Sequence, residues 1–249
     1  MMEYRIENCA NCAESAVRAE VGGAYRVELC AGMPEGGTTP SYGEIRAARA
    51  AIGIKLNVIV RPRGGDFCYA QRELEAMIYD IEMARSLGVD GLVFGCLTPN
   101  GAVDKEAMKR LMAAAGDTPV TFHRAIDMCR DMEQALEDIV SLGCRRILTS
   151  GGSATALEGM ERIALLVQRA AGRIIIMPGG GVNAANIVHL ARETGAREFH
   201  FSARADEPSP MLYRREGISM GGTVTIDEYK RSLTSPEKIR AALEALRHI

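Results

Sequence analysis

Eight short apolar segments recur along the chain, and a longer segment with helical spacing of its apolar residues follows each of them. Such short apolar runs are typical of strands that are buried on both faces of a parallel sheet. The predicted strands are Arg5–Cys9, Arg26–Cys30, Leu56–Arg61, Leu92–Cys96, Val120–Arg124, Arg146–Thr149, Ile174–Met177 and Glu198–Ser202.

The predicted helices end at similar joints. The clearest helix is Arg72–Leu87, whose apolar residues recur at helical spacing. A glycine precedes several of the following strands, at Gly88, Gly143, Gly172 and Gly195. Glycine suits this place because the residue after a helix often takes a left-handed conformation. The recurrence every 25 to 35 residues or so indicates repeated βα units.

Eight such units predict a single (β/α)8 barrel over residues 1–249, a length typical of this fold. A doubly wound open sheet is the alternative, but it usually has fewer strands, and no G-x-G-x-x-G follows the first strand. Two segments depart from the repeat. Gly32–Ser41 is a Gly/Pro-rich loop long enough to cover a site, and about 204–235 is predicted to be irregular before a closing helix at about 236–248.

Composition narrows the choice of partners. The hydrophobic fraction of 47% allows a large core, and the net charge of −2 without a basic cluster argues against nucleic acid. Neither a signal peptide nor an apolar run of membrane-spanning length is present in the sequence. Seven cysteines do not fit a secreted disulfide framework. We therefore expect reduced thiols, a cytoplasmic location and no membrane partner.

Polar residues gather at the predicted carboxyl ends of the strands, where barrels of this type place their active sites. The first two strands end in Glu7-Asn8-Cys9 and Glu28-Leu29-Cys30. Each Glu shares a face with its own Cys, and equivalent positions on neighbouring strands would bring the two pairs together. A buried carboxylate needs a cation, a metal or strong donors, so both glutamates are candidate acid/base residues. Structural pairing with nearby arginines is the alternative.

The third and fifth predicted strands add cations and a histidine. Arg61 and Arg63 flank Pro62 and suit a carboxylate or phosphate ligand. His123 and Arg124 lie at the end of the fifth strand, and His123 is a candidate catalytic residue, although a lone histidine is more often a core residue.

Glycine-rich turns follow the sixth and seventh strands, and such turns let backbone N–H groups approach an anion. Barrels often bind a substrate phosphate after strands seven and eight, although glycine turns also serve as tight connections. The predicted anion-binding set is Arg61, Arg63, Arg124, Gly151, Gly152, Gly180, Gly181 and Ser202.

Five cysteines are expected near this rim, and soft thiolates are the preferred ligands of Cu(I). They are Cys9, Cys30, Cys68, Cys96 and Cys129. Cys9 also forms a C-x-x-C with Cys12, a spacing compatible with metal binding or redox chemistry. No second C-x-x-C completes a zinc site, and scattered small buried thiols remain the alternative.

Several longer motifs span nearly the whole chain. They are Arg26-Val27-Glu28-Leu29-Cys30, Glu35-Gly36-Gly37-Thr38-Thr39-Pro40-Ser41, Arg61-Pro62-Arg63-Gly64-Gly65-Asp66-Phe67-Cys68-Tyr69, Thr121-Phe122-His123-Arg124-Ala125, Leu148-Thr149-Ser150-Gly151, Gly179-Gly180-Gly181-Val182, His200-Phe201-Ser202-Ala203 and Ser209-Pro210-Met211. In content and order they closely resemble the CutC family, known as copper homeostasis proteins.

This resemblance implies a cytoplasmic TIM barrel, often a homodimer, with a role in copper trafficking or tolerance. It also implies Cys9 and Cys30 as the Cu(I) ligands, whereas Cys12 occupies a position where relatives commonly have serine. The first hypothesis is thus a Cu(I)-binding protein with these two thiolates as linear ligands.

The second hypothesis is an enzyme for a small anionic or phosphorylated metabolite. Here Arg61, Arg63 and the loops at Gly180 and Ser202 hold the anion. Glu7, Glu28 or His123 acts as general acid/base. A scaffold that serves only oligomer contacts is a third hypothesis, and it leaves the polar rim without a reason.

Overall fold

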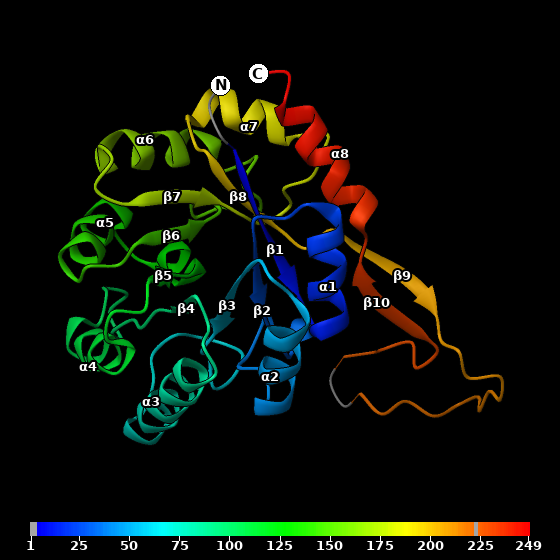
Figure 1. Ribbon diagram of the computed structural model, residues 1–249. Helices are drawn as coiled ribbons and strands as arrows, with labels where there is room; N and C mark the ends of the chain where they lie inside the picture. Colours follow the sequence, from blue (N-terminus) through cyan, green and yellow to red (C-terminus); the bar gives the residue numbers. More distant parts are fainter. Residues whose placement is uncertain (1–3, 222–223) are drawn as a thin grey trace.

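The computed structural model describes residues 4–221 and 224–249, and its centre is a barrel of eight parallel strands (Figure 1). Neighbouring strands pair in the order β7-β6-β5-β4-β3-β2-β1-β8. Their bounds are β1 Arg5–Ala10, β2 Arg26–Leu29, β3 Lys55–Ile59, β4 Gly91–Phe94, β5 Val120–Phe122, β6 Arg146–Thr149, β7 Ile175–Pro178 and β8 Glu198–Phe201. The predicted (β/α)8 barrel is confirmed.

The barrel closes between β7 and β8 through a single isolated bridge, from Gly179 to His200, among the described residues. A Cβ atom at Gly179 would lie 3.4 Å from His200 Cβ and 2.5 Å from Leu148 Cδ1, so glycine eases the close packing at this bridge. The other neighbouring strands are joined by longer ladders, of two to four paired positions each. The β7–β8 seam is therefore the most weakly paired part of the sheet.

Helices surround the barrel and follow the strands in alternation (Figure 1). They are α1 Ala13–Gly22, α2 Tyr42–Ala51, α3 Gln71–Ser86, α4 Lys105–Ala115, α5 Met132–Ser141, α6 Met160–Ala170, α7 Ile187–Thr194 and α8 Pro236–Leu246, with 3₁₀ turns η1 Met33–Glu35 and η2 Arg124–Met128. The four glycines expected at helix–strand joints all have positive φ, as predicted. None of these helices combines the length and apolar character needed to span a bilayer.

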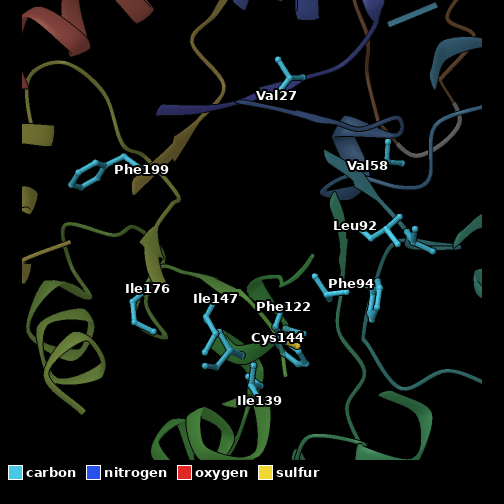
Figure 2. Close-up of a cluster of buried hydrophobic side chains, with 14 of the residues drawn as sticks. Val27, Val58, Leu92, Phe94, Phe122, Ile139, Cys144, Ile147, Ile176 and Phe199 are labelled. Atoms are coloured by element: carbon cyan, nitrogen blue, oxygen red, sulfur yellow. The ribbon is translucent and has the colours of Figure 1, made fainter. Parts of the chain in front are cut away.

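The main core lies between the strands and the helices. The strand side chains that point outward are large and apolar, and they pack against the helical layer in a ring of contacts (Figure 2). This ring includes Val27, Val58, Leu92, Phe94, Phe122, Ile147, Ile176 and Phe199, all buried. Helix residues such as Ile139 of α5 complete it. Burial of each such side chain contributes on the order of 2 kcal/mol to stability.

The alternate strand positions face the barrel interior, and many of them are charged. Arg26 donates hydrogen bonds to Glu7 and Glu198, and Arg146 donates a second one to Glu198 at 2.7 Å. Arg146 also reaches Thr121 on the neighbouring strand at 3.4 Å. These buried ions are paired with one another and form an ionic network at the floor of the barrel.

The segment predicted to be irregular at about 204–235 contains a β-hairpin. Strands β9, Arg204–Pro208, and β10, Lys230–Thr234, pair antiparallel beside the barrel (Figure 1). Their residues are mostly polar and partly exposed, so they lack the apolar run that revealed the other strands. The hairpin is held to β1 where Thr234 donates a hydrogen bond to Asn8 at 3.0 Å.

Candidate functional site

A hollow of about 110 Å³ opens at the carboxyl end of the barrel strands. Its walls come from strand ends far apart in the sequence and from two loops. The lining residues are Cys9, Glu28, Cys30, Gly36, Ile59, Arg61, Phe67, His123, Arg124, Leu148 and His200. The volume exceeds that of a single water molecule several-fold, so a small ligand fits. Glu28, Arg61 and His123 thus line one shielded hollow, although they come from the ends of three different strands, β2, β3 and β5.

The loop Gly32–Ser41, which was predicted to cover a site, contributes Gly36 to the wall of this hollow. Arg61 donates two hydrogen bonds into the 32–41 loop, to the carbonyls of Glu35 at 2.9 Å and Gly37 at 3.0 Å. It donates a third to the carbonyl of Gly65 at 2.7 Å. Its guanidinium therefore fastens two loops over the hollow, and Gly36 becomes part of the wall.

The two Glu-x-Cys motifs sit at different heights in the barrel. In the β1–β2 register Cys9 is opposite Glu28, whereas Glu7 is opposite Arg26. The second motif is thus shifted by two residues toward the rim, so the motifs are not equivalent as their spacing suggested. Glu28 joins Cys9 and Cys30 in the hollow, while Glu7 lies one layer below, where it binds Arg26 and His200.

Cys9 and Cys30 form a buried thiol pair with their Sγ atoms 3.8 Å apart. Ile59 and Val93 enclose them in a small apolar cluster, against which Met33 of the covering loop packs. The pair is diagonal across two strands, since Cys9 is opposite Glu28 rather than Cys30. Strand spacing places such Cα atoms about 8 Å apart. A disulfide spans no more than about 7 Å, so the strands oppose its formation.

His200 on β8 connects the thiol pair to the carboxylates. Its Nδ1 lies 2.8 Å from Glu7 Oε1, and its Nε2 lies 3.5 Å from Glu28 Oε2. Burial disfavours the charged imidazolium, but hydrogen bonds to Cys9 and Glu7 and the charges of both glutamates outweigh it and hold the pKa of His200 well above its usual value. The sequence motifs contained His200 without assigning it a role; its position two residues after the inward-facing Glu198 was the available signal.

The pKa values of the acidic groups in and directly below the hollow are shifted in opposite directions. Burial would raise the pKa of Glu7, but the charge of Arg26 and the hydrogen bond with His200 hold it well below its ordinary value. Burial raises the pKa of Glu28 to about 8, helped by the charges of Cys9 and Glu7 and opposed by that of His200. The hydrogen bond from Cys30 lowers the pKa of the Cys9 thiol, and the same bond raises that of Cys30. Cys9 is therefore the thiol of the pair that loses its proton first, and at neutral pH burial favours the protonated form of Glu28.

Two buried groups of the wall have unused hydrogen-bonding capacity. Arg61 is 5% exposed and stacks on Phe67 at 4.9 Å, but in the described part of the chain no carboxylate pairs with it and its Nε has no partner. His123 is 4% exposed; its Nδ1 accepts a hydrogen bond from the Ala125 N–H, while its Nε2 has no partner. Burial and the charge of Arg61 lower the pKa of His123 to about 3. The neutral ring of His123 therefore has an Nε2–H donor without a partner, and the nearby Arg61 has no carboxylate partner among the described residues.

The predicted anion-binding set is only partly brought together. Arg61 and Arg124 line the hollow. Arg63 instead lies at the surface, where it binds Glu73 at 2.6 Å and Asp66 at 3.1 Å. The predicted residues that do not line the hollow are Arg63, Gly151, Gly152, Gly180, Gly181 and Ser202.

Asp127 explains why the turn after β6 is not an open anion site. Its carboxylate accepts hydrogen bonds from the backbone N–H groups of Ser150 and Gly152 and from the Thr149 hydroxyl. It also pairs with Arg124 at 2.8 Å. An internal carboxylate thus takes the place that the glycine-rich turn suggested for a ligand's anion.

The remaining cysteines lie apart from the thiol pair. Cys12, which completes the C-x-x-C, contacts Asn11 and Ser15 and is 3.6 Å from the Ser15 hydroxyl. Within the described residues, the potential metal-binding groups contain Cys9 and Cys30 but neither Cys12 nor Cys68. All seven thiols are free.

Comparison with known proteins gives a consistent result. A family model described as the CutC family matches residues 4–205. A protein from Bacteroides thetaiotaomicron named family protein CutC is 55% identical over 248 residues, covering 99% of this chain and 100% of the relative. The human copper homeostasis protein cutC homolog is 47% identical over 237 residues, covering 95% and 87%.

Solved structures agree with this result. The putative copper homeostasis protein CutC from Streptococcus agalactiae superposes with a TM-score of 0.77 at 39% identity, over 80% of this chain and 98% of that one. A phosphoribosylanthranilate isomerase from Thermotoga maritima, at 11% identity and a TM-score of 0.55, shares the barrel fold alone.

Proposed function

The chain belongs to the CutC family, and from this membership and the geometry of the hollow we infer that it binds Cu(I) through Cys9 and Cys30. The carrying observation is the pair of Sγ atoms 3.8 Å apart in a buried cluster. The human relative is named as a copper homeostasis protein. A role in copper trafficking or tolerance then follows from reversible capture of the ion by this thiol pair.

The surroundings of the pair suit a soft monovalent ion. Thiolate and thioether sulfurs are the ligands that select Cu(I), and Met33 places a thioether side chain against the two cysteines. The His200 imidazolium supplies a positive charge beside the thiolates, which offsets the negative charge of a dithiolate complex. The diagonal placement of the cysteines opposes their oxidation to a disulfide, so the ligands stay available.

Competition with a Cu(I)-specific chelator tests this proposal on the reduced full-length protein. We expect one Cu(I) per chain, held against the chelator, and loss of this binding in a Cys9→Ser/Cys30→Ser double variant. Cys12→Ser is the matched control, because its thiol lies outside the pair, and it should bind like the wild type. A double variant that holds copper as tightly as the wild type would refute the assignment.

A second function, as an enzyme for a small anionic metabolite, is supported by the unpaired polar atoms of Arg61 and His123. A buried cation without a carboxylate is costly, and a ligand carboxylate or phosphate would compensate it. Glu28, with a pKa raised to about 8, is suited to act as a general acid toward such a ligand. Crystals grown in phosphate test this function: an anion within hydrogen-bonding distance of His123 Nε2 supports it, and a hollow without anion density argues against it.

Homodimer formation and a cytoplasmic location remain predictions of the family resemblance. The segment between β9 and β10 exposes several large apolar side chains, among them Leu212 at 98% and Met220 at 82% exposure. Sedimentation velocity of the purified protein measures the oligomeric state directly.

A further inference from the structure

Further side chains that could bind a metal ion lie beside the Cys9–Cys30 pair. Two groups of three possible ligands are present in the described residues, Cys9 with Glu28 and Cys30, and Glu7 with Glu28 and His200. In each group the donor atoms lie within 4.8 Å of one another, and Glu28 belongs to both. Cys9, Cys30, Glu28 and His200 all line the same hollow.

Two of the donor separations match those expected around a tetrahedral ion, one between the two sulfurs and one between His200 and Glu28. A zinc–sulfur bond of about 2.3 Å requires two sulfurs about 3.8 Å apart in a tetrahedron, and about 4.6 Å apart in a linear arrangement. The observed Sγ–Sγ separation is 3.8 Å. Bonds of about 2.1 Å to nitrogen and oxygen require a separation of about 3.4 Å. His200 Nε2 lies 3.5 Å from Glu28 Oε2.

The orientation of His200 is that of a metal-binding histidine. Histidine ligands usually direct their second ring nitrogen to a carboxylate, which fixes the ring and its tautomer. His200 Nδ1 contacts Glu7 Oε1 at 2.8 Å, and Glu7 is itself held by Arg26 and by Asn57, at 3.3 Å in the latter case. This arrangement leaves Nε2 directed toward Glu28.

We infer that this site is also a four-donor centre for a divalent zinc-like ion, with Cys9, Cys30, His200 and Glu28 as ligands and Glu7 as the residue that orients His200. The inference rests on the proposed metal binding by the cysteine pair, and adds two ligands and a second class of ion. Two thiolates, a neutral imidazole and a carboxylate form a set of N, S and O donors that Zn²⁺ accepts. Binding releases the protons that Glu28, Cys30 and His200 Nε2 carry, so it strengthens with rising pH.

Titration of the reduced, metal-free full-length chain with Co²⁺ tests the inference, because tetrahedral cobalt–thiolate centres absorb in both the near-ultraviolet and the visible. We expect one Co²⁺ per chain with both bands, displaced by one equivalent of Zn²⁺. His200→Gln and Glu28→Gln should each weaken Co²⁺ binding at least tenfold and change the visible band. Loss of a residue that merely orients a metal ligand costs about 10- to 100-fold in metal affinity. Loss of a ligand itself should therefore cost at least tenfold.

His189→Gln is the matched control, since His189 is an exposed histidine on α7, and it should bind Co²⁺ like the wild type. Circular dichroism and thermal unfolding of each variant verify that the barrel is intact. Co²⁺ binding without a thiolate band, or unchanged binding in His200→Gln, would overturn the four-donor centre while leaving the Cu(I) proposal intact. A wild-type protein that binds neither Cu(I) nor Co²⁺ would overturn both the Cu(I) proposal and the four-donor centre.

Discussion

Mild acid should destabilise the protein through His123, because this histidine is buried in its neutral form. Burial and Arg61 hold its pKa at about 3 in the folded state, whereas a histidine in the unfolded chain titrates near 6.5. The unfolded state therefore binds more protons than the folded state between these two values, and stability falls as the pH falls below about 6.5. From pH 7 to pH 5 the loss amounts to ~2 kcal/mol, and it is insensitive to the folded-state pKa as long as that stays below about 4.

The assay is urea denaturation at pH 7 and pH 5 of the wild type and of His123→Asn. Asparagine does not titrate, and its side-chain oxygen can still accept the Ala125 N–H that caps η2. The wild type should lose about 2 kcal/mol more than the variant over this interval. His189→Asn, an exposed replacement on α7, should retain the full wild-type loss. Equal losses in the wild type and His123→Asn would show that His123 is not buried neutral.

Three further substitutions test other parts of the structure. Glu198→Gln leaves two buried arginines without their shared carboxylate and should cost about 3–5 kcal/mol in urea denaturation, whereas Glu137→Gln at an exposed pair should cost less than about 1 kcal/mol. Asp127→Asn weakens several hydrogen bonds to one carboxylate; we expect a loss of about 2 kcal/mol and faster amide exchange in the turn after β6. Gly37 has a φ of +94°, which residues with a side chain rarely adopt. Gly37→Ala should therefore lower the free energy of unfolding by about 1–2 kcal/mol, measured by thermal unfolding.

The repeat of apolar strands and glycine-ended helices was sufficient to predict the barrel, because both patterns depend on local chain geometry. The rim location of the site followed from the same argument, since parallel strands end on one side. Cys9, Glu28, Arg61 and His123 were accordingly predicted to lie near one another, and they do. The strand ends at Ile59, Phe94 and Phe122 fall two residues before the predicted ends, where the chain turns into the loops.

Strand register could not be predicted in this way. The two Glu-x-Cys motifs look equivalent in sequence, but the stagger between β1 and β2 places Glu28, and not Glu7, in the hollow. Stagger is a property of the closed barrel as a whole, so no local pattern encodes it. The role of Asp127 was hidden for a similar reason, since its contacts with Ser150 and Gly152 join residues more than twenty positions apart. The polar hairpin of β9 and β10 gave no apolar signal at all.

The single bridge at the β7–β8 seam has a consequence for how the hollow exchanges its contents. Local opening of a sheet follows the path on which fewest hydrogen bonds break, and here that path runs beside Gly179 and His200. Transient opening between β7 and β8 would move the His200 imidazole away from Glu28 and expose the Cys9 and Cys30 thiols. His200, a proposed ligand, thus lies beside the most weakly paired part of the barrel wall, and an ion bound by His200 and the β1 and β2 residues would hold this part of the wall together.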